Sequence, residues 1–299
     1  MEAPVSTPVA VAPGSATAES ATLRGPQLRR RRPVRPARVL LLLLMLAIAV
    51  VMIYPFYFMI DTSFKTQDQF QSGHGHSLSS WGKLTSALPV GQQLTNSMIV
   101  CVLSILIILA VSTMAGFAFA KLRFTGATPV FVAIIAALLI PMQSIIIPAY
   151  VNISKLNLLT SYAGAVLVYA ALGTPFATFL MTAYFRGLPD ELIEAAVVDG
   201  LGYGRVFVRI ALPLAVPAIV TVTVLQFIQI WDDLLVGLLF LQNPDERTIT
   251  VGLGALSAGR VTDIPVLMAG SLVSAIPAVL VYLIFQRYLI SGLTAGIGK

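Results

Sequence analysis

The sequence is poor in charged residues and in cysteine. Asp, Glu, Lys and Arg make up 11% of its 299 residues, whereas about 25% is usual for a soluble domain. The single cysteine, Cys101, excludes a disulfide framework and a multi-cysteine metal cluster. Apolar residues make up 57% of the chain, which excludes a disordered or fibrous protein. The composition therefore favours an integral membrane protein.

Motifs for nucleotide and metal chemistry are also missing. The chain has no Gly-x-x-x-x-Gly-Lys-Ser/Thr phosphate loop, and the glycines of residues 200–204 follow a predicted helix rather than a strand. His74 and His76 lack a third ligand nearby, so no metal site is predicted. Cys101 has no nearby base and is expected to be an inert, small apolar residue. We therefore predict that the chain is not an enzyme and that it holds no cofactor.

The sequence does contain six long apolar runs. A bilayer core about 30 Å thick needs about 20 apolar residues in a helix, and lipid offers no partner for unpaired backbone groups. The sequence therefore predicts an all-α integral membrane protein with six transmembrane helices, joined after the first by an extracytoplasmic loop over residues 61–97. The predicted spans are residues 39–60, 98–120, 129–151, 163–185, 214–241 and 265–286.

The positions of Lys and Arg predict the orientation of these spans. Cytoplasmic loops carry an excess of basic residues, and an even number of spans puts both termini on one side. That side holds all but five of the nineteen basic residues, so the N and C termini are predicted to be cytoplasmic. Residues 1–38 are expected to be a disordered basic tail and residues 287–299 a short cytoplasmic tail. The five basic residues on the other side are Lys65, Lys83, Lys155, Arg247 and Arg260.

Two features near the N-terminus have alternative interpretations. The first apolar run is longer than the usual signal-peptide core, and no small-residue cleavage pattern follows it, so we expect a retained span. The four arginines of residues 29–32 are interpreted as a topology anchor beside anionic lipid rather than as a nucleic-acid site.

Residues 186–213 form a long cytoplasmic loop with a helical pattern. Pro189 suits the first turn of a short helix. Gly200 suits its end, because glycine adopts the left-handed backbone conformation at a helix end more easily than other residues. A second short helix is predicted over about residues 205–210. Two short helices that meet at glycines would make a compact projection beneath the membrane.

This loop has a glutamate followed by two alanines, a glycine four residues later and an isoleucine–alanine–leucine–proline end at residues 210–213. The pattern resembles the coupling loop of permease subunits in ATP-binding-cassette (ABC) importers. Residues 117–124, 240–248 and 286–296 are similar to the maltose-type carbohydrate permeases, and the resemblance covers residues 39–299. It implies the type I ABC importer permease fold over residues 92–287, in the cytoplasmic (inner) membrane. The residues expected to couple to an ATPase are Glu194, Ala195, Ala196, Asp199, Gly200, Ile210, Leu212 and Pro213.

The resemblance also implies partners. The loop would insert into a groove on a cytoplasmic ATPase, where Glu194 would pair with a basic residue, and Ile210, Leu212 and Pro213 would set the second helix against the bundle. The expected assembly contains a second homologous permease, two ATPase subunits that bind ATP and Mg, and an extracytoplasmic sugar-binding protein. The expected function is the translocation of a sugar, driven by ATP hydrolysis in the other subunits.

Polar residues interrupt the fifth apolar run. A carboxylate at mid-bilayer costs about 2.5–3.5 kcal/mol, so Asp232 and Asp233 are expected to face a cavity, another subunit or the outer interface. The related permeases have an asparagine where this chain has Asp232, which leaves its role open between cavity lining and an ion pair with the partner permease. Sugars need hydrogen-bonding groups beside an aromatic face. The candidates for the substrate path, with packing or gating as the alternative role, are Gln226, Gln229, Trp231, Asp232 and Asp233.

Three other functions are weighed against this one. The same importer could carry a polyamine or glycerol phosphate. Internally repeated halves would favour a secondary transporter driven by an ion gradient, and no such repeat is evident. A membrane-embedded enzyme needs clustered His, Asp or Glu, and the predicted spans offer one acidic pair and no histidine.

Overall fold

The computed structural model describes residues 36–259 and 262–294, and all regular structure in these residues is helical. The side chains are described for residues 40–259 and 262–288. Most of the tail predicted over residues 1–38, including the arginines of residues 29–32, lies outside the described residues, as do Arg260 and residues 295–299. The all-helical fold predicted from the sequence is confirmed.

The chain divides into two units, Met1–Met52 and Ile53–Lys299. Helix α1 (Pro36–Ser63) begins in the first unit and ends in the second. In the first unit, the side chains from Leu40 to Met52 are all exposed. This exposure suits a helix surrounded by lipid, because apolar side chains in a bilayer core contact lipid tails and not water.

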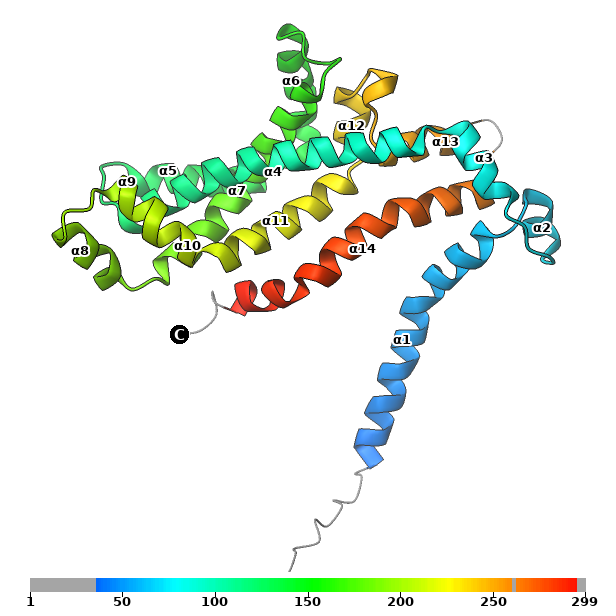
Figure 1. Ribbon diagram of the computed structural model, residues 1–299, viewed down its shortest axis with the longest axis horizontal. Coiled ribbons are helices and arrows are strands. Elements are labelled where there is room, and N and C mark those ends of the chain that lie inside the picture. The colour runs from blue at the N-terminus through cyan, green and yellow to red at the C-terminus, as the bar shows by residue number, and fades with distance from the viewer. Residues whose placement is uncertain (1–35, 260–261, 295–299) are drawn as a thin grey trace, which may run out of the picture. The chain divides into compact units, whose positions relative to one another are not determined.

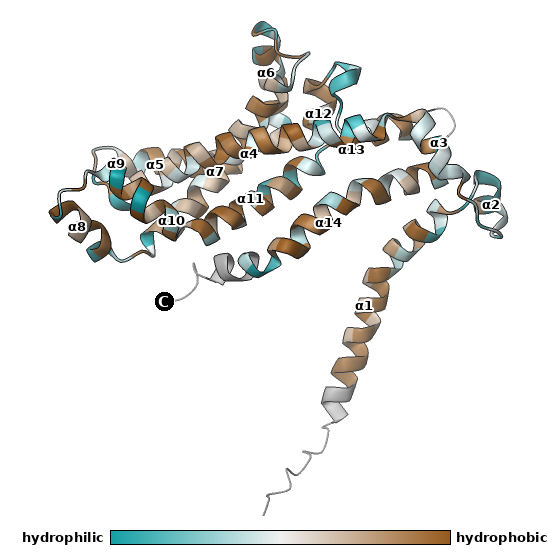
Figure 2. Ribbon diagram, in the orientation of Figure 1, coloured by the Kyte–Doolittle hydropathy of each residue, from teal (hydrophilic) through white to brown (hydrophobic). Residues whose placement is uncertain are grey.

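Four long helices organise the second unit. They are α4 (Val90–Lys121), α7 (Tyr162–Arg186), α11 (Val216–Trp231) and α14 (Ile264–Thr294). Helix α7 packs along α4, and α11 lies between α4 and α14 (Figure 1). Their facing side chains form one core that includes the fully buried Ile108, Met181 and Val222. Figure 2 shows that apolar residues dominate these helices along most of their length.

Four of the six predicted spans are single helices. Apolar stretches long enough to cross a membrane run over Leu40–Ser63, Val90–Lys121, Tyr162–Arg186 and Ile264–Tyr288. They correspond to the first, second, fourth and sixth predicted spans. The structure extends the second of these to Val90, because the polar residues of its first two turns continue the same helix.

The third predicted span is a broken helix in the structure. Helices α5 (Ala127–Ala136) and η1 (Ala137–Leu139) are followed, after a bend of 103°, by α6 (Met142–Lys155). The break falls at Pro141, which precedes α6 and has no N–H to continue the helical hydrogen bonds. Two shorter segments therefore occupy the apolar run of residues 129–151.

The fifth predicted span, residues 214–241, is also divided. A helical segment over Tyr203–Leu214 bends by 72° into α11, which ends at Trp231. Helix α12 (Leu235–Phe240) then follows separately. The bend falls at Ala215, just before Pro217 in the first turn of α11, and the two aspartates lie between α11 and α12.

Short helices join the long ones. Helices α2 (Gln67–Ser72) and α3 (Ser79–Ala87) follow α1, and α8 (Asp190–Val198) follows α7. Helix η3 (Pro244–Glu246) and α13 (Ile249–Ser257) precede α14. Prolines lie inside α1, α6, α7 and α14, at Pro55, Pro148, Pro175 and Pro277.

The crossing of α4 and α7 gives a test of this packing. A Cβ atom on Gly116 would lie 2.7 Å from Cβ of Met181 and 3.0 Å from the backbone nitrogen of Thr182. Gly116→Ala should therefore push the helices apart and lower the free energy of unfolding by about 1–3 kcal/mol. Thermal unfolding in detergent measures this loss.

Gly91→Ala is the matched control, because it lies on the same helix and its added Cβ meets nothing within 4 Å. It should leave the melting temperature unchanged or slightly raised, since alanine favours a helix. Equal melting temperatures for the two variants would contradict the close approach of α4 and α7.

Candidate functional site

The loop of residues 186–213 folds as two short helical segments that meet at a glycine. Helix α8 begins after Pro189, with Asp190 and Glu191 in its first turn, where the helix dipole favours acidic side chains. It ends at Val198, two residues before Gly200, whose φ of 87° is left-handed. The amide of Gly200 donates to the carbonyl of Val197, and that of Leu201 donates to the carbonyl of Ala196. These two bonds form a Schellman motif, which confirms the predicted helix stop.

Helix α8 has one face against the protein and one face in the open. Ile193 and Ala196 are buried in the core cluster. Glu194 and Ala195 are exposed, and Val198 is 86% exposed. Asp199 and Gly200 are exposed as well. The glutamate and first alanine of the motif thus form an accessible surface, whereas the second alanine anchors the helix.

The second segment of the loop starts earlier than predicted. Helix α9 (Tyr203–Val206) continues as a π-helical turn, η2 (Phe207–Ala211), and then as α10 (Leu212–Leu214). Val206 and Ala211 are fully buried. Ile210 and Leu212 are half-buried, and Pro213 is exposed. The hydroxyl of Tyr184 on α7 donates to the carbonyl of Leu214 at 2.7 Å, which holds the segment to the long helices.

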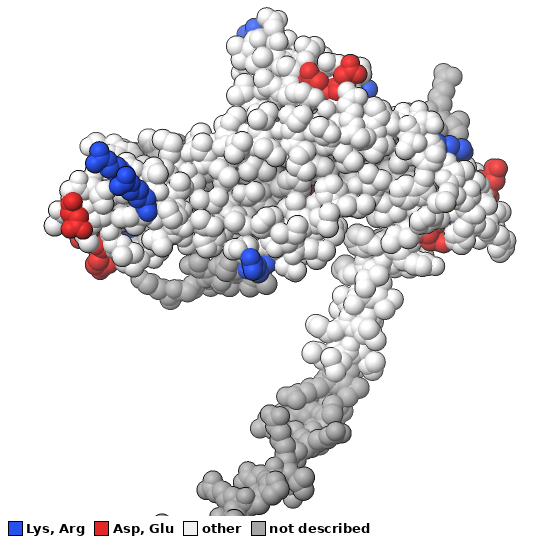
Figure 3. Space-filling view, viewed as in Figure 1, with Lys and Arg blue, Asp and Glu red and all other residues white. Residues whose placement is uncertain are grey.

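Charges of both signs gather on this loop. Figure 3 shows acidic side chains over α8 beside basic side chains over the α9 segment. The acidic residues include Glu191 and Glu194, and the basic ones are Arg205 and Arg209. The face between the two ends of the long helices is almost free of charge (Figure 3). The loop is therefore a polar surface at the end of an apolar bundle.

Lys121 ties this loop to α4. Its side chain is 3% exposed, and its ammonium group donates to the carbonyl of Leu188 at 2.6 Å and to the carboxylate of Asp190. This hydrogen bond, with the charge of Lys121, lowers the pKa of Asp190 below its usual value. The ion pair is therefore formed at neutral pH and is lost as the pH falls through that lowered pKa. The sequence signals only a basic residue on the predicted cytoplasmic side, in the last turn of a helix.

A pocket of about 750 Å³ lies beside the Lys121–Asp190 ion pair. Its walls come from the end of α4, from α8 and from the start of α9, and include Arg123, Glu194 and Tyr203. Because the lining is largely polar and open, it can accept part of another protein.

Three of the predicted path residues meet at a second place, between α7 and α11. Gln226, Gln229 and Asp233 line a cavity of about 30 Å³ together with Tyr169 and Gly173. The carboxylate of Asp233 accepts hydrogen bonds from the hydroxyl of Tyr169 at 2.9 Å and from the amide of Val236 at 2.8 Å.

Gln226 adds an unpaired donor to this polar cluster. Its side chain is 1% exposed, and its Nε2 atom has no hydrogen-bond partner within the protein. Its Oε1 atom lies so close to Gly173 that a Cβ there would approach it to 2.5 Å. A buried amide without a partner costs free energy, so this donor is available to a hydroxyl group that enters the cavity.

Trp231 and Asp232 lie outside that cavity. The indole of Trp231 donates to the carbonyl of Ser274 on α14 at 2.9 Å and stacks on Phe227, with ring centroids 5.2 Å apart. Its ring face is thus occupied by packing. Asp232 follows the last residue of α11 and is exposed. The structure therefore groups three of the five candidates and separates the other two.

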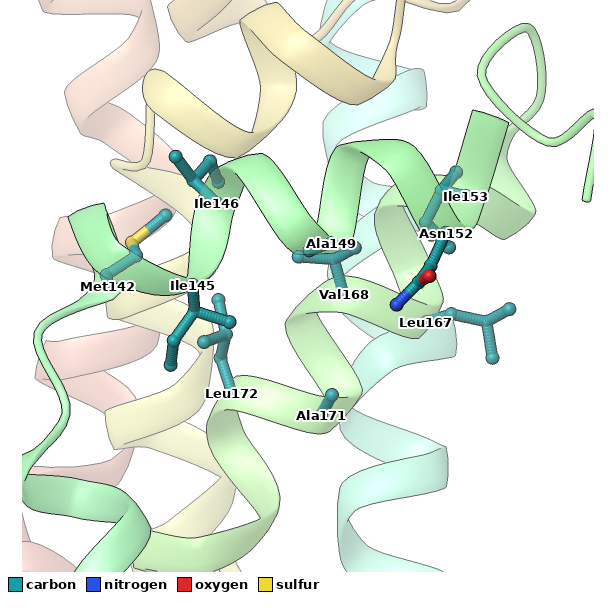
Figure 4. Close-up of a pocket in the computed structure, with 10 residues that line it drawn as sticks. All are labelled: Met142, Ile145, Ile146, Ala149, Asn152, Ile153, Leu167, Val168, Ala171 and Leu172. Atoms are coloured by element: carbon teal, nitrogen blue, oxygen red, sulfur yellow. The ribbon is translucent and has the colours of Figure 1, made fainter. Parts of the chain in front are cut away.

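Another pocket, of about 170 Å³, lies between α6 and α7 (Figure 4). Asn152 is the one polar side chain among the ten that line it. An apolar lining suits a hydrocarbon group or another helix rather than a sugar. Among the residues whose side chains are described, no three His, Cys, Asp or Glu converge to hold a metal ion.

Helices long enough to cross a membrane, an exposed helical loop and a polar cluster between two helices are features that suit a membrane transport component. The chain belongs to the family of the binding-protein-dependent transport system inner membrane component, whose model matches residues 29–294.

Curated relatives and a solved structure agree with this assignment. The osmoprotective compounds uptake permease protein GgtD of Synechocystis is 34% identical over 220 residues, which cover 73% of this chain and 74% of that protein. The arabinooligosaccharides transport system permease protein AraQ of Halalkalibacterium halodurans is 33% identical, over 67% of this chain and 71% of that protein. In fold, the chain resembles a bacterial ABC transporter involved in the import of the acidic polysaccharide alginate, with a TM-score of 0.74, 22% identity and coverage of 85% of this chain and 98% of that chain.

The chain is therefore an inner-membrane permease component of an ABC importer. Such a permease works with an ATPase and a substrate-binding protein. The predicted type I ABC importer permease fold and the predicted membrane location are confirmed.

The left-handed glycine at the end of α8 gives a test of the loop. Gly200→Ala should destabilise the turn by about 1–2 kcal/mol, because an L-residue pays this cost in the left-handed region. No steric clash contributes, since a Cβ there meets nothing within 4 Å. Hydrogen exchange of the amides of residues 197–201 should become faster.

Gly202→Ala is the control, because Gly202 has a φ of −70° and equally open surroundings. Its exchange rates should match those of the wild type. If both variants exchange alike, the left-handed turn does not hold the loop.

Proposed function

We propose that the chain is a transmembrane subunit of an ATP-driven importer that carries a sugar into the cytoplasm. It would pair with a second homologous permease, two cytoplasmic ATPase subunits that bind ATP and Mg, and an extracytoplasmic sugar-binding protein. The observation that carries this proposal is the two-sided helix α8, with Ile193 and Ala196 in the core and Glu194 and Ala195 exposed. Both termini would be cytoplasmic.

The coupling role rests on how α8 is joined to the rest of the protein. A partner that pushes on its exposed face moves Ile193 and Ala196, which pack in the same cluster as residues of α4 and α7. The predicted coupling residues Asp199, Ile210, Leu212 and Pro213 lie on the same loop. ATP then acts through a difference in the affinity of the ATPases for the inward-open and outward-open states of the permease.

A bulky residue on the exposed face of α8 tests this docking. Ala195→Trp should leave the permease folded, because Ala195 is exposed, but should block the approach of the ATPase. We expect a loss of at least about 2 kcal/mol in association, or about 30-fold, as for a central interface position. Co-purification with the ATPase and sugar uptake into proteoliposomes measure the loss.

Ala87→Trp serves as the control, since Ala87 is likewise an exposed alanine on a short helix, in this case α3. It should assemble and transport normally. Normal assembly of the Ala195→Trp protein would refute the coupling role of α8.

The substrate path rests on the cluster between α7 and α11. Two glutamine amides and the Asp233–Tyr169 pair supply donors and acceptors in one place, which suits a neutral, hydroxyl-rich solute. The residues that line the cavity include no Lys or Arg, which a glycerol phosphate would require. The cavity, at about 30 Å³, has room for one hydroxyl group of a solute, and its lining suits a hydroxyl better than a phosphate. These groups therefore favour a sugar over a phosphorylated cargo, and a polyamine is the alternative that the carboxylate allows.

Removing one amide tests this path. Gln229 is exposed on α11 and lines the cavity, so Gln229→Ala should weaken a hydrogen bond to the solute without unfolding the protein. The loss of one such bond, about 0.5–1.5 kcal/mol, corresponds to a reduction of about 2- to 10-fold in uptake. Uptake of a panel of sugars by the reconstituted importer measures it.

Gln286→Ala removes an exposed glutamine amide near the end of α14 and should transport at the wild-type rate. The lining role is wrong if the Gln229→Ala importer keeps both its rate and its preference among sugars.

An inactive ATPase separates this importer from an ion-driven carrier. The carrier would keep transporting, and this importer should stop.

A further inference from the structure

Helix α4 is continuous from one end of the bundle to the other. Among the described helices of at least 25 residues, it is the one that contains no proline. It is a single α-helix over Val90–Lys121, and the part from Asn96 to Lys121 is about 37 Å long at 1.5 Å per residue. A helix without a proline lacks the usual hinge at which a long helix bends.

One end of α4 is fastened to the loop that carries α8. The buried ammonium group of Lys121 bonds to the carbonyl of Leu188 and to the carboxylate of Asp190, at the start of α8. These contacts join segments that lie 67 and 69 residues apart in the chain. A movement of the start of α8 therefore acts directly on the end of α4.

The other end of α4 is fastened to residues 245–249. The amide group of Asn96, a residue 3% exposed, donates to the carbonyls of Asp245 at 2.7 Å and Arg247 at 3.0 Å. Next to it, the hydroxyl of Ser97 accepts from the amide of Ile249 at 3.0 Å. These bonds hold the turn that leads into α13 and from there to α14.

We propose that α4 is a rigid strut that transmits movement of the α8 loop to residues 243–252, with Lys121 and Asn96 as the positioning residues at its two ends. This inference rests on the proposed function, since it gives the ATP-driven movement of α8 a route across the membrane. Helices with internal prolines, such as α7 and α14, can bend between their ends. The strut keeps its ends at a fixed separation while those helices change shape.

A strut with a fastening at each end has a distinctive signature. The two fastenings act in series, so cutting either one interrupts the same route. Substitutions at sites this far apart that act only on stability add independently. Lys121→Met and Asn96→Ala should therefore each impair coupling, and the double variant should be no worse than either single variant.

The experiment uses the complete importer in proteoliposomes. Sugar transported per ATP hydrolysed should fall by about 2- to 30-fold in each single variant, the range by which coupling residues act. Hydrogen exchange of the amides of residues 243–252 should change on addition of ATP and vanadate in the wild type. That change should disappear in both single variants and in the double variant, while the ATPase subunits remain bound.

Lys83→Met is the matched control, because it removes a lysine whose ion pair with Asp263, at 3.0 Å, lies on α3 and not on α4. It should keep the wild-type ratio and the nucleotide-dependent exchange. Lys121→Arg should restore part of the coupling, since a guanidinium can reach the same two oxygens.

Two results would overturn the strut. One is an additive loss in the double variant, and the other is an unchanged exchange response in the Lys121→Met importer. Failure of the proposed function looks different, because the wild-type assembly itself would then show no ATP-dependent uptake.

Discussion

Lipid offers no hydrogen-bond partner to a backbone, and this constraint shapes the whole chain. Every backbone group at membrane depth must be satisfied within the protein, so apolar residues form helices and the short polar side chains bond to nearby carbonyls. Thr113, Thr174 and Thr182 each donate to the carbonyl four residues earlier. Charges are consequently concentrated at the ends of the helices, where another protein can bind them.

The two-sided loop follows from the same constraint. Helix α8 is short and cannot be stable alone, so it depends on its buried side chains, on the Gly200 turn and on the bond from Lys121. The exposed side chains of α8, such as Glu194 and Ala195, do not pack against the core. A surface that is firmly attached on one side and accessible on the other is suited to receive force from a partner, and α4 extends from this attachment to the opposite end of the bundle.

Much of this arrangement could be predicted from local sequence. Apolar runs specify spans, and the glutamate–alanine–alanine–glycine pattern specified both α8 and its end at Gly200. The breaks at Pro141 and Ala215 were not predicted, because a proline in an apolar run is compatible with either a kink or a full break. Packing against neighbouring helices decides between them.

Contacts between residues far apart in the chain could not be predicted from the local sequence. Lys121 carries no local sign that it bonds to Leu188, 67 residues away. Trp231 is of the residue type that often stacks on sugars, but its indole N–H donates to the carbonyl of Ser274 and its ring stacks on Phe227. Gln226, Gln229 and Asp233 lie together because their spacing puts them on one side of α11 and its end. The sequence does not show that Tyr169 and Gly173 of α7 complete this cavity.

The central claim is that the loop of residues 186–213 is a cytoplasmic docking surface for an ATPase, and chemical labelling tests it directly. Val198→Cys places a thiol at a position that is 86% exposed on α8, while the native Cys101 is 1% exposed and should not react. A membrane-impermeant maleimide should label this thiol in inside-out vesicles and not in right-side-out vesicles, and bound ATPase subunits should protect it. Labelling from the external side, or equal labelling with and without the ATPase, would contradict the account.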